Sequence, residues 1–169
     1  FVIEKGPNKD FVLLNLSDIQ LSDEDAHGYF GELAEALIDK LITDTQPDLI
    51  TLSGDNVYGW LGWIWLIDLL DSYKIPWAPV FGNHDGEEGF HTEFQMMQYM
   101  EYPNCRSNLN DADVYGCGNC CVTIQHSGSD KNAFAIWLID SNDYQRNAVG
   151  GLDYDCVHPD QIEWYERKA

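Results

Sequence analysis

Basic residues are scarce in this chain. Of its 169 residues only 9 are Lys or Arg, against 29 Asp or Glu, and the formal net charge is −20. A strongly acidic surface repels the phosphates of nucleic acids, so we expect no nucleic-acid partner. A small phosphorylated molecule could still bind where bound cations reverse the local sign of the charge.

Long apolar runs and paired cysteines are also missing. The longest apolar stretch, residues 60–70, is too short to cross a bilayer and contains Asp68, so we expect no membrane partner. The five cysteines are an odd number, which fits no complete set of disulfides. The CGNCC cluster, residues 117–121, has no second CxxC to complete a zinc site. Reduced thiols weakly favour a cytoplasmic location, and an extracytoplasmic one stays open.

Short apolar runs alternate with helical patterns in the first hundred residues. The patterns predict strands at residues 11–16, 49–52 and 77–81, and helices at 27–43, 59–73 and 92–100. Alternation of this kind predicts parallel strands joined by right-handed crossovers. Farther on, two strands are expected at residues 120–125 and 133–139, and a helix at 159–168 that begins with a proline.

Polar side chains follow each of the first three predicted strands. They are Asp18, Asp55 and the pair Asn83 and His84. Ligands in such sheets bind beyond the carboxyl ends of the strands, so these side chains are expected to meet on one rim. Oxygen ligands with one imidazole suit Mn, Fe, Zn or Mg. Each signal is weak alone, because Asp and Gly-Asp are common at turns and helix caps.

The order of the three motifs is more specific than any one of them. LSDIQ, SGDNVY and FGNHDG, in that order, resemble the motifs of the calcineurin-like metallophosphoesterases. The later SNDY and HPDQIEWYE resemble the purple-acid-phosphatase-like branch, and the resemblance covers residues 11–168. It implies an α/β fold in which a two-sheet β-sandwich is flanked by helices, a four-layer αββα arrangement. Residues 1–169 would then be the N-terminal portion of a single domain that lacks its C-terminal part.

The resemblance also implies roles for individual residues. Asp18 would bind one metal ion, Asp55 would bridge two, and Asn83 would bind the second through its side-chain carbonyl oxygen. His84 would act on the leaving group as general acid or electrostatic stabiliser. Two divalent or trivalent ions, Fe with Mn or Zn, would supply a metal-bound hydroxide that attacks phosphorus. Asn56 is a candidate for substrate binding.

One position departs from the family pattern. Gln20 stands where the family has the histidine of its DxH motif, and an amide oxygen is a weaker ligand than an imidazole. Tyr58 follows Asp55 at the spacing of the GDxxY motif of purple acid phosphatases, whose tyrosine binds a ferric ion. Tyr58 as a ferric ligand, Tyr58 as a packed aromatic beside Trp60, and Gln20 as a weak or water-mediated ligand all stay open.

The later histidine motifs of the family are not found in this sequence. It contains no GHxH, and its other histidines lack the expected neighbours. We therefore expect the C-terminal segment of the same protein, possibly as a separate fragment, to complete the site. The predicted function is metal-dependent hydrolysis of a phosphoric ester. The alternative is a non-catalytic relative that binds metal or phosphate.

Overall fold

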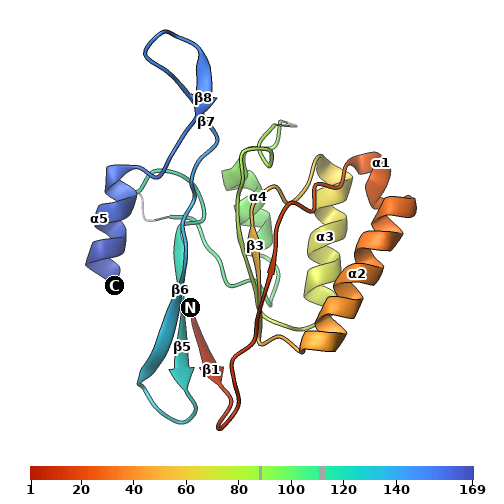
Figure 1. Cartoon of the computed structure of the whole chain (residues 1–169), viewed down its shortest axis with the longest axis vertical. Coiled ribbons are helices and arrows are strands. Elements are labelled where there is room, and N and C mark those ends of the chain that lie inside the picture. Colours follow the sequence, from red (N-terminus) through yellow and green to blue (C-terminus); the bar gives the residue numbers. More distant parts are fainter. Residues whose placement is uncertain (88, 111–112) are drawn as a thin grey trace.

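The computed structural model describes residues 1–87, 89–110 and 113–169. This part of the chain forms two three-stranded sheets, a two-stranded ribbon and five helices (Figure 1). The strands are β1 (Val2–Lys5), β2 (Leu13–Leu16), β3 (Leu49–Ser53), β4 (Trp77–Val80), β5 (Cys120–His126), β6 (Asn132–Leu138), β7 (Tyr144–Arg146) and β8 (Leu152–Tyr154). The helices are α1 (Asp23–Ala26), α2 (Tyr29–Thr45), α3 (Trp60–Ser72), α4 (Thr92–Tyr99) and α5 (Pro159–Lys168).

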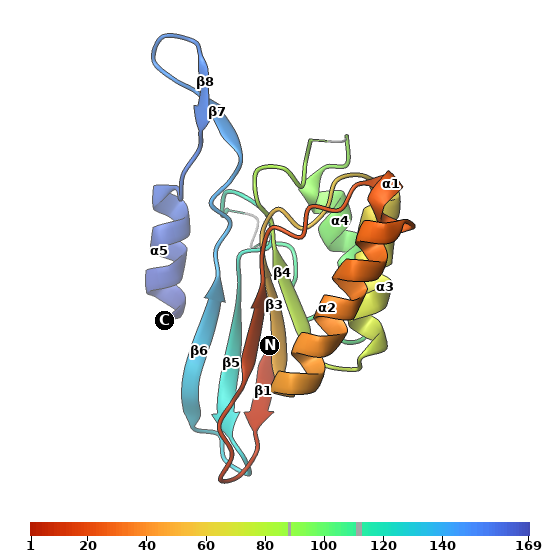
Figure 2. The same ribbon diagram turned by 45° about the vertical axis from the view of Figure 1, so that its right-hand side comes forward.

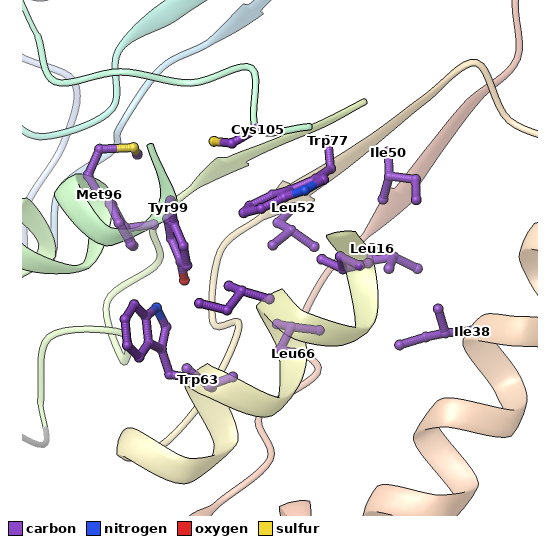
Figure 3. Packing of buried hydrophobic residues seen from close by; sticks show 14 of the residues in the cluster. Leu16, Ile38, Ile50, Leu52, Trp63, Leu66, Trp77, Met96, Tyr99 and Cys105 are labelled. Atoms are coloured by element: carbon purple, nitrogen blue, oxygen red, sulfur yellow. The ribbon is translucent and has the colours of Figure 1, made fainter. Parts of the chain in front are cut away.

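The sheet β2-β3-β4 is parallel and carries the three motif loops at its carboxyl ends. Its central strand is buried on both faces, which explains the unbroken apolar run LITL. On one face Ile50, Leu52 and Trp77 form a core with Trp63 and Leu66 of α3, shown in Figure 3. The helices α1 to α4 lie on this side (Figure 2). The predicted alternation of strand and helix is confirmed.

The opposite face of this sheet packs against the second sheet. Leu49 and Val80 share a buried cluster with Val122 and Ile124 of β5. In the second sheet β5 pairs in parallel with β1 and antiparallel with β6. Residues alternate between the two faces of each strand, so the same short sequences build both layers of the core.

Helix α5 covers the outer face of the second sheet. The Trp137 ring of β6 meets Trp164 edge-on at 5.4 Å and Tyr165 at 4.8 Å between ring centroids. The layer order is therefore helices, sheet, sheet, helix. This agrees with the mixed α/β sandwich expected from the sequence.

Four elements were not anticipated: β1, α1, and the strands β7 and β8 of the ribbon. Strand β1 is four residues long and half exposed, and its partner Thr123 lies far along the chain, so local pattern gives no signal. The ribbon β7–β8 is mostly exposed and has no apolar alternation. It projects beyond the two sheets in both views (Figures 1 and 2). Helix α1 is a single turn capped by the Ser22 hydroxyl, which accepts from Asp25 N.

All five cysteines lie in the described part of the chain and are free thiols. Within the described residues, no helix combines the length and the apolar character needed to cross a bilayer.

Candidate metal and phosphate site

The motif loops meet at the carboxyl ends of β2, β3 and β4. The Asp18 amide donates to Gly54 O at 3.1 Å, and the Gln20 amide donates to Asp55 O at 3.2 Å. Asp18, Asp55 and Asn83 line one open pocket of about 360 Å³. The structure thus brings together three side chains that the sequence placed on one rim.

Two glycines let the second and third motif loops approach each other. A Cβ on Gly82 would lie 2.2 Å from Asp55 Oδ1 and 2.5 Å from Asp55 N. A Cβ on Gly54 would lie 2.7 Å from Gly82 N, and Gly54 also has a φ of +102°. These contacts explain why glycine precedes the aspartate in one motif and the asparagine in the other.

The backbone is strained at three of the candidate ligand residues. Asp18, Gln20 and Asp55 have φ values of 55°, 50° and 51°, in the left-handed region that non-glycine residues seldom adopt. Residues in such conformations cost about 1–3 kcal/mol each and persist only where surrounding contacts fix them. Here the fixing contacts are the backbone hydrogen bonds between the two loops.

Asp85 connects the second and third motif loops through its side-chain carboxylate. Its carboxylate is buried and accepts from Gly82 N at 2.7 Å, Asn56 N at 2.8 Å and Val57 N at 3.3 Å. Burial raises the pKa of Asp85 to about 6, despite these donors. The Asp85 carboxylate thus serves the backbone amides of both loops.

Asn56 is not placed to touch a substrate, contrary to the expectation from the sequence. Its side chain is fully buried at 0% exposure and donates to Val80 O at 3.1 Å and to Asp85 Oδ2 at 3.2 Å. Asn56 follows the aspartate of the second motif, which suggested a pocket position. The left-handed turn at Asp55 instead directs the next side chain inward.

Asp55 is the most closely held of the candidate ligands. Its Oδ1 accepts from the His84 amide at 3.1 Å, and its Oδ2 accepts from Gln20 Nε2 at 3.0 Å. In this arrangement Gln20 supports a carboxylate through its amide nitrogen. Ligation by the Gln20 carbonyl oxygen would need a different orientation of that side chain and stays a prediction.

The His84 ring has an acidic partner, Glu87, on the side that carries Nδ1. Its Nδ1 lies 2.8 Å from Glu87 Oε2, an ion-pair distance, although the direction departs from that of a good hydrogen bond. Its Nε2 lies 4.0 Å from Asp55 Oδ2. Glu87 raises the pKa of His84, and His84 in turn lowers the pKa of Glu87. The acidic partner thus stabilises the imidazolium form of His84 relative to a free histidine side chain.

Tyr58 lies beside His84 with 5.3 Å between the ring centroids. Burial, followed by the charges of Glu87 and Asp55, raises the pKa of Tyr58. A phenolate at this position therefore needs a cation to stabilise it. The ligand role and the packed-aromatic role of Tyr58 both stay predictions.

Two further side chains at the site, Tyr144 and Glu87, were given no role by the sequence analysis. Asn83 Nδ2 donates to the hydroxyl of Tyr144 at 2.8 Å, and that hydroxyl donates to Glu87 Oε1 at 3.3 Å. Tyr144 lies on β7, and its ring stacks on Tyr154 of β8 at 5.5 Å. The ribbon thus contacts the third motif loop. The SNDY segment was noted for its resemblance alone, and nothing in its spacing indicated this contact.

The donor set around the pocket fits a hard cation. Asp18 and Asp55 offer carboxylate oxygens, and the Asn83 Oδ1 has no hydrogen bond to a described residue. Oxygen ligands of this kind suit Mg, Mn and Fe. Among the described residues, no group of three or more His, Cys, Asp or Glu converges as a metal site. Completion of the ligand set by other residues of the same protein stays a prediction.

Comparison with known proteins agrees with this geometry. The family model for calcineurin-like phosphoesterases matches residues 11–168. Over 156 residues the chain is 32% identical to "Probable inactive purple acid phosphatase 14" of Arabidopsis thaliana, covering 79% of this chain and 37% of that protein. It is 28% identical to "Probable inactive purple acid phosphatase 29" of the same plant, covering 77% of this chain and 37% of that protein.

A yeast protein shows the same partial overlap. The chain is 24% identical to "Phosphatase DCR2" of Saccharomyces cerevisiae, covering 78% of this chain and 25% of that protein. The chain thus spans little more than a third of the two plant relatives and a quarter of the yeast one. The family match covers nearly the whole chain, includes all three motif loops, and agrees with the four-layer architecture. This chain belongs to the calcineurin-like phosphoesterase family.

Proposed function

We propose that the protein containing this chain is a metal-dependent phosphoesterase that hydrolyses a small phosphorylated substrate. The observation that carries the proposal is the convergence of Asp18, Asp55 and Asn83 on one pocket, with His84 held beside Asp55. These residues come from three separate strand ends. Turn formation alone would not require three oxygen-bearing side chains to line the same cavity.

Asp18, Asp55 and Asn83 would hold a dinuclear centre, for which Fe with Mn or Zn is the expected composition. Such a centre supplies a nucleophile at neutral pH and neutralises charge on the phosphoryl group. Asp55 is suited to bridging because its two oxygens are fixed by separate donors, His84 N and Gln20 Nε2.

His84 is proposed as the group that protonates the leaving oxygen. Because Glu87 occupies the side of the ring that carries Nδ1, the Nε2 atom is left to serve the substrate. The ring is partly open to solvent, with 31% of the side chain exposed, so a substrate oxygen could reach it. A general acid of this kind contributes about 10²–10⁴ in rate.

The remaining ligands are proposed to come from the C-terminal segment of the same protein, in the same polypeptide or as a separate fragment. Two observations support this: no three His, Cys, Asp or Glu side chains converge among the described residues, and the plant relatives extend well beyond the matched region. On this proposal residues 1–169 are the N-terminal portion of one domain.

A non-catalytic relative that binds metal is the second candidate. Two observations favour it: the names of the two plant relatives contain "inactive", and Gln20 occupies the position of an expected histidine ligand. Such a protein would bind a cation through the same three residues without turnover.

The test uses the full-length protein, loaded with Fe, Mn or Zn and supplied with p-nitrophenyl phosphate and its diester. We expect metal-dependent release of p-nitrophenol, which Asp55→Asn abolishes together with cation binding. The matched control is Asp130→Asn, the same change at an exposed position in the turn between β5 and β6. Cation binding without turnover on either ester would support the non-catalytic candidate.

A further inference from the structure

A directed chain of polar contacts links the ribbon β7–β8 to the third motif loop. It runs from the side-chain amide of Asn83 through the Tyr144 hydroxyl to Glu87. The other carboxylate oxygen of Glu87 contacts His84. Tyr144 contacts two residues of the loop after β4 at once. They are Asn83, which lines the pocket, and Glu87, which contacts His84. Among the hydrogen bonds of the described residues, only those of Tyr144 join Asn83 to Glu87.

The chemistry of these groups fixes the direction of each contact. An ionised carboxylate can only accept, so the Tyr144 hydroxyl must give its single proton to Glu87. The same hydroxyl oxygen can then only accept from Asn83, which must present its NH₂ group. With its nitrogen turned to Tyr144, Asn83 is left with Oδ1 as the atom available to a cation.

We propose that Tyr144 is a positioning residue that orients the Asn83 carbonyl oxygen toward the metal pocket. The role rests on the proposed function only in so far as that function requires a cation at Asn83. If the NH₂ group of Asn83 faced the pocket, its hydrogens would point at the cation and repel it. Tyr144 removes this alternative before the cation arrives, which lowers the cost of binding.

The arrangement of the ribbon supports the assignment. The Tyr144 ring stacks on Tyr154, the residue that ends β8 and also lines the pocket. Tyr165 on α5 provides the matched comparison, because it lies outside the pocket lining, its ring packs on Trp137, and its hydroxyl makes no hydrogen bond to any described residue. Tyr144 and Tyr165 therefore share packing against an aromatic ring and differ in the polar contact.

The experiment measures Mn²⁺ affinity of the full-length protein by isothermal titration calorimetry, with the EPR spectrum of the bound ion as a second readout. Tyr144→Phe removes the hydroxyl and keeps the ring. We expect Mn²⁺ affinity to fall by about 10–100-fold and the EPR spectrum to change. Tyr165→Phe is expected to leave both unchanged. Thermal unfolding of the metal-free variants checks that each is folded.

A double-mutant cycle separates orientation from general damage. Aspartate at position 83 presents oxygen in either orientation, so in the Asn83→Asp background Tyr144→Phe is expected to cause no further loss of affinity. An equal loss in both backgrounds, equal affinity of Tyr144→Phe and Tyr165→Phe, or a wild-type protein that binds no Mn²⁺ would each overturn the proposal. Normal Mn²⁺ binding without ester hydrolysis would contradict the proposed function alone, since the Tyr144 effect is read from binding.

Discussion

Gly82→Ala is the most direct test of how the motif loops fit together. The added Cβ would lie 2.2 Å from Asp55 Oδ1, 2.5 Å from Asp55 N and 3.0 Å from Asp55 Cγ. Carbon and oxygen atoms in contact are about 3.5 Å apart, so the overlap exceeds about 1 Å. One of the atoms in conflict is backbone, and rotation of a side chain cannot relieve it.

The expected destabilisation combines two effects. Overpacking of a close-packed region costs about 1–3 kcal/mol. A shift of Asp55 would also weaken its hydrogen bonds from His84 N and Gln20 Nε2, each worth about 1 kcal/mol or more. We expect the free energy of unfolding to fall by about 2–4 kcal/mol, and cation affinity to fall with it because Asp55 moves.

Gly86→Ala is the matched control. Gly86 lies in the same loop, its nearest neighbour to an added Cβ is at 3.9 Å, and its φ is not left-handed. We expect a change within about 1 kcal/mol, slightly stabilising, because alanine restricts the unfolded chain. Urea unfolding of the metal-free full-length protein measures both variants, with the midpoint compared at constant m. Equal stability of Gly82→Ala and Gly86→Ala would show that the loops do not approach as described.

Three further predictions concern single side chains. His84→Ala should lower turnover of an active protein by about 10²–10⁴ while changing the unfolding midpoint little; unchanged turnover would remove His84 from the mechanism. If Tyr58 binds Fe(III), the iron-loaded protein should show a visible phenolate-to-iron absorption that Tyr58→Phe removes; an active, iron-replete sample without the band would exclude this ligand. Burial raises the pKa of Asp85 from 3.8 to about 6, so the folded state holds this proton more tightly than the unfolded chain does. The free energy of unfolding of the metal-free protein should therefore fall, by up to about 3 kcal/mol, as pH rises from about 4 to 7, and a flat or rising profile would contradict this assignment.

Local pattern was sufficient for the elements that build the sheet next to the site. The run LITL has apolar residues on both faces of β3, and the ends of that strand are marked by Pro47 and by the turn at Gly54. The strand ends in turn located Asp18 and Asp55, since parallel strands bring their carboxyl ends to one edge. Side chains fixed by topology in this way are readable from a sequence.

Asn56 and Tyr144 show where such reading fails. Asn56 sits in the middle of a motif, yet the left-handed backbone of Asp55 turns it into the core, where Asp85 binds it. Tyr144 lies 61 residues from Asn83 along the chain, and their contact depends on how a mostly exposed ribbon folds back. Neither backbone handedness at one residue nor the path of a polar ribbon has a periodic signature in the sequence.

The charge around the pocket bears on how either candidate could bind phosphate. Four carboxylate residues line it, namely Asp18, Asp55, Asp143 and Asp155, and among the described lining residues there is no Lys or Arg. A phosphate dianion brought into such a pocket meets repulsion of the same sign from several sides. Phosphate binding without a cation is therefore disfavoured for this chain. Any affinity for phosphoesters should appear only after metal loading and vanish with a chelator, whether or not turnover follows.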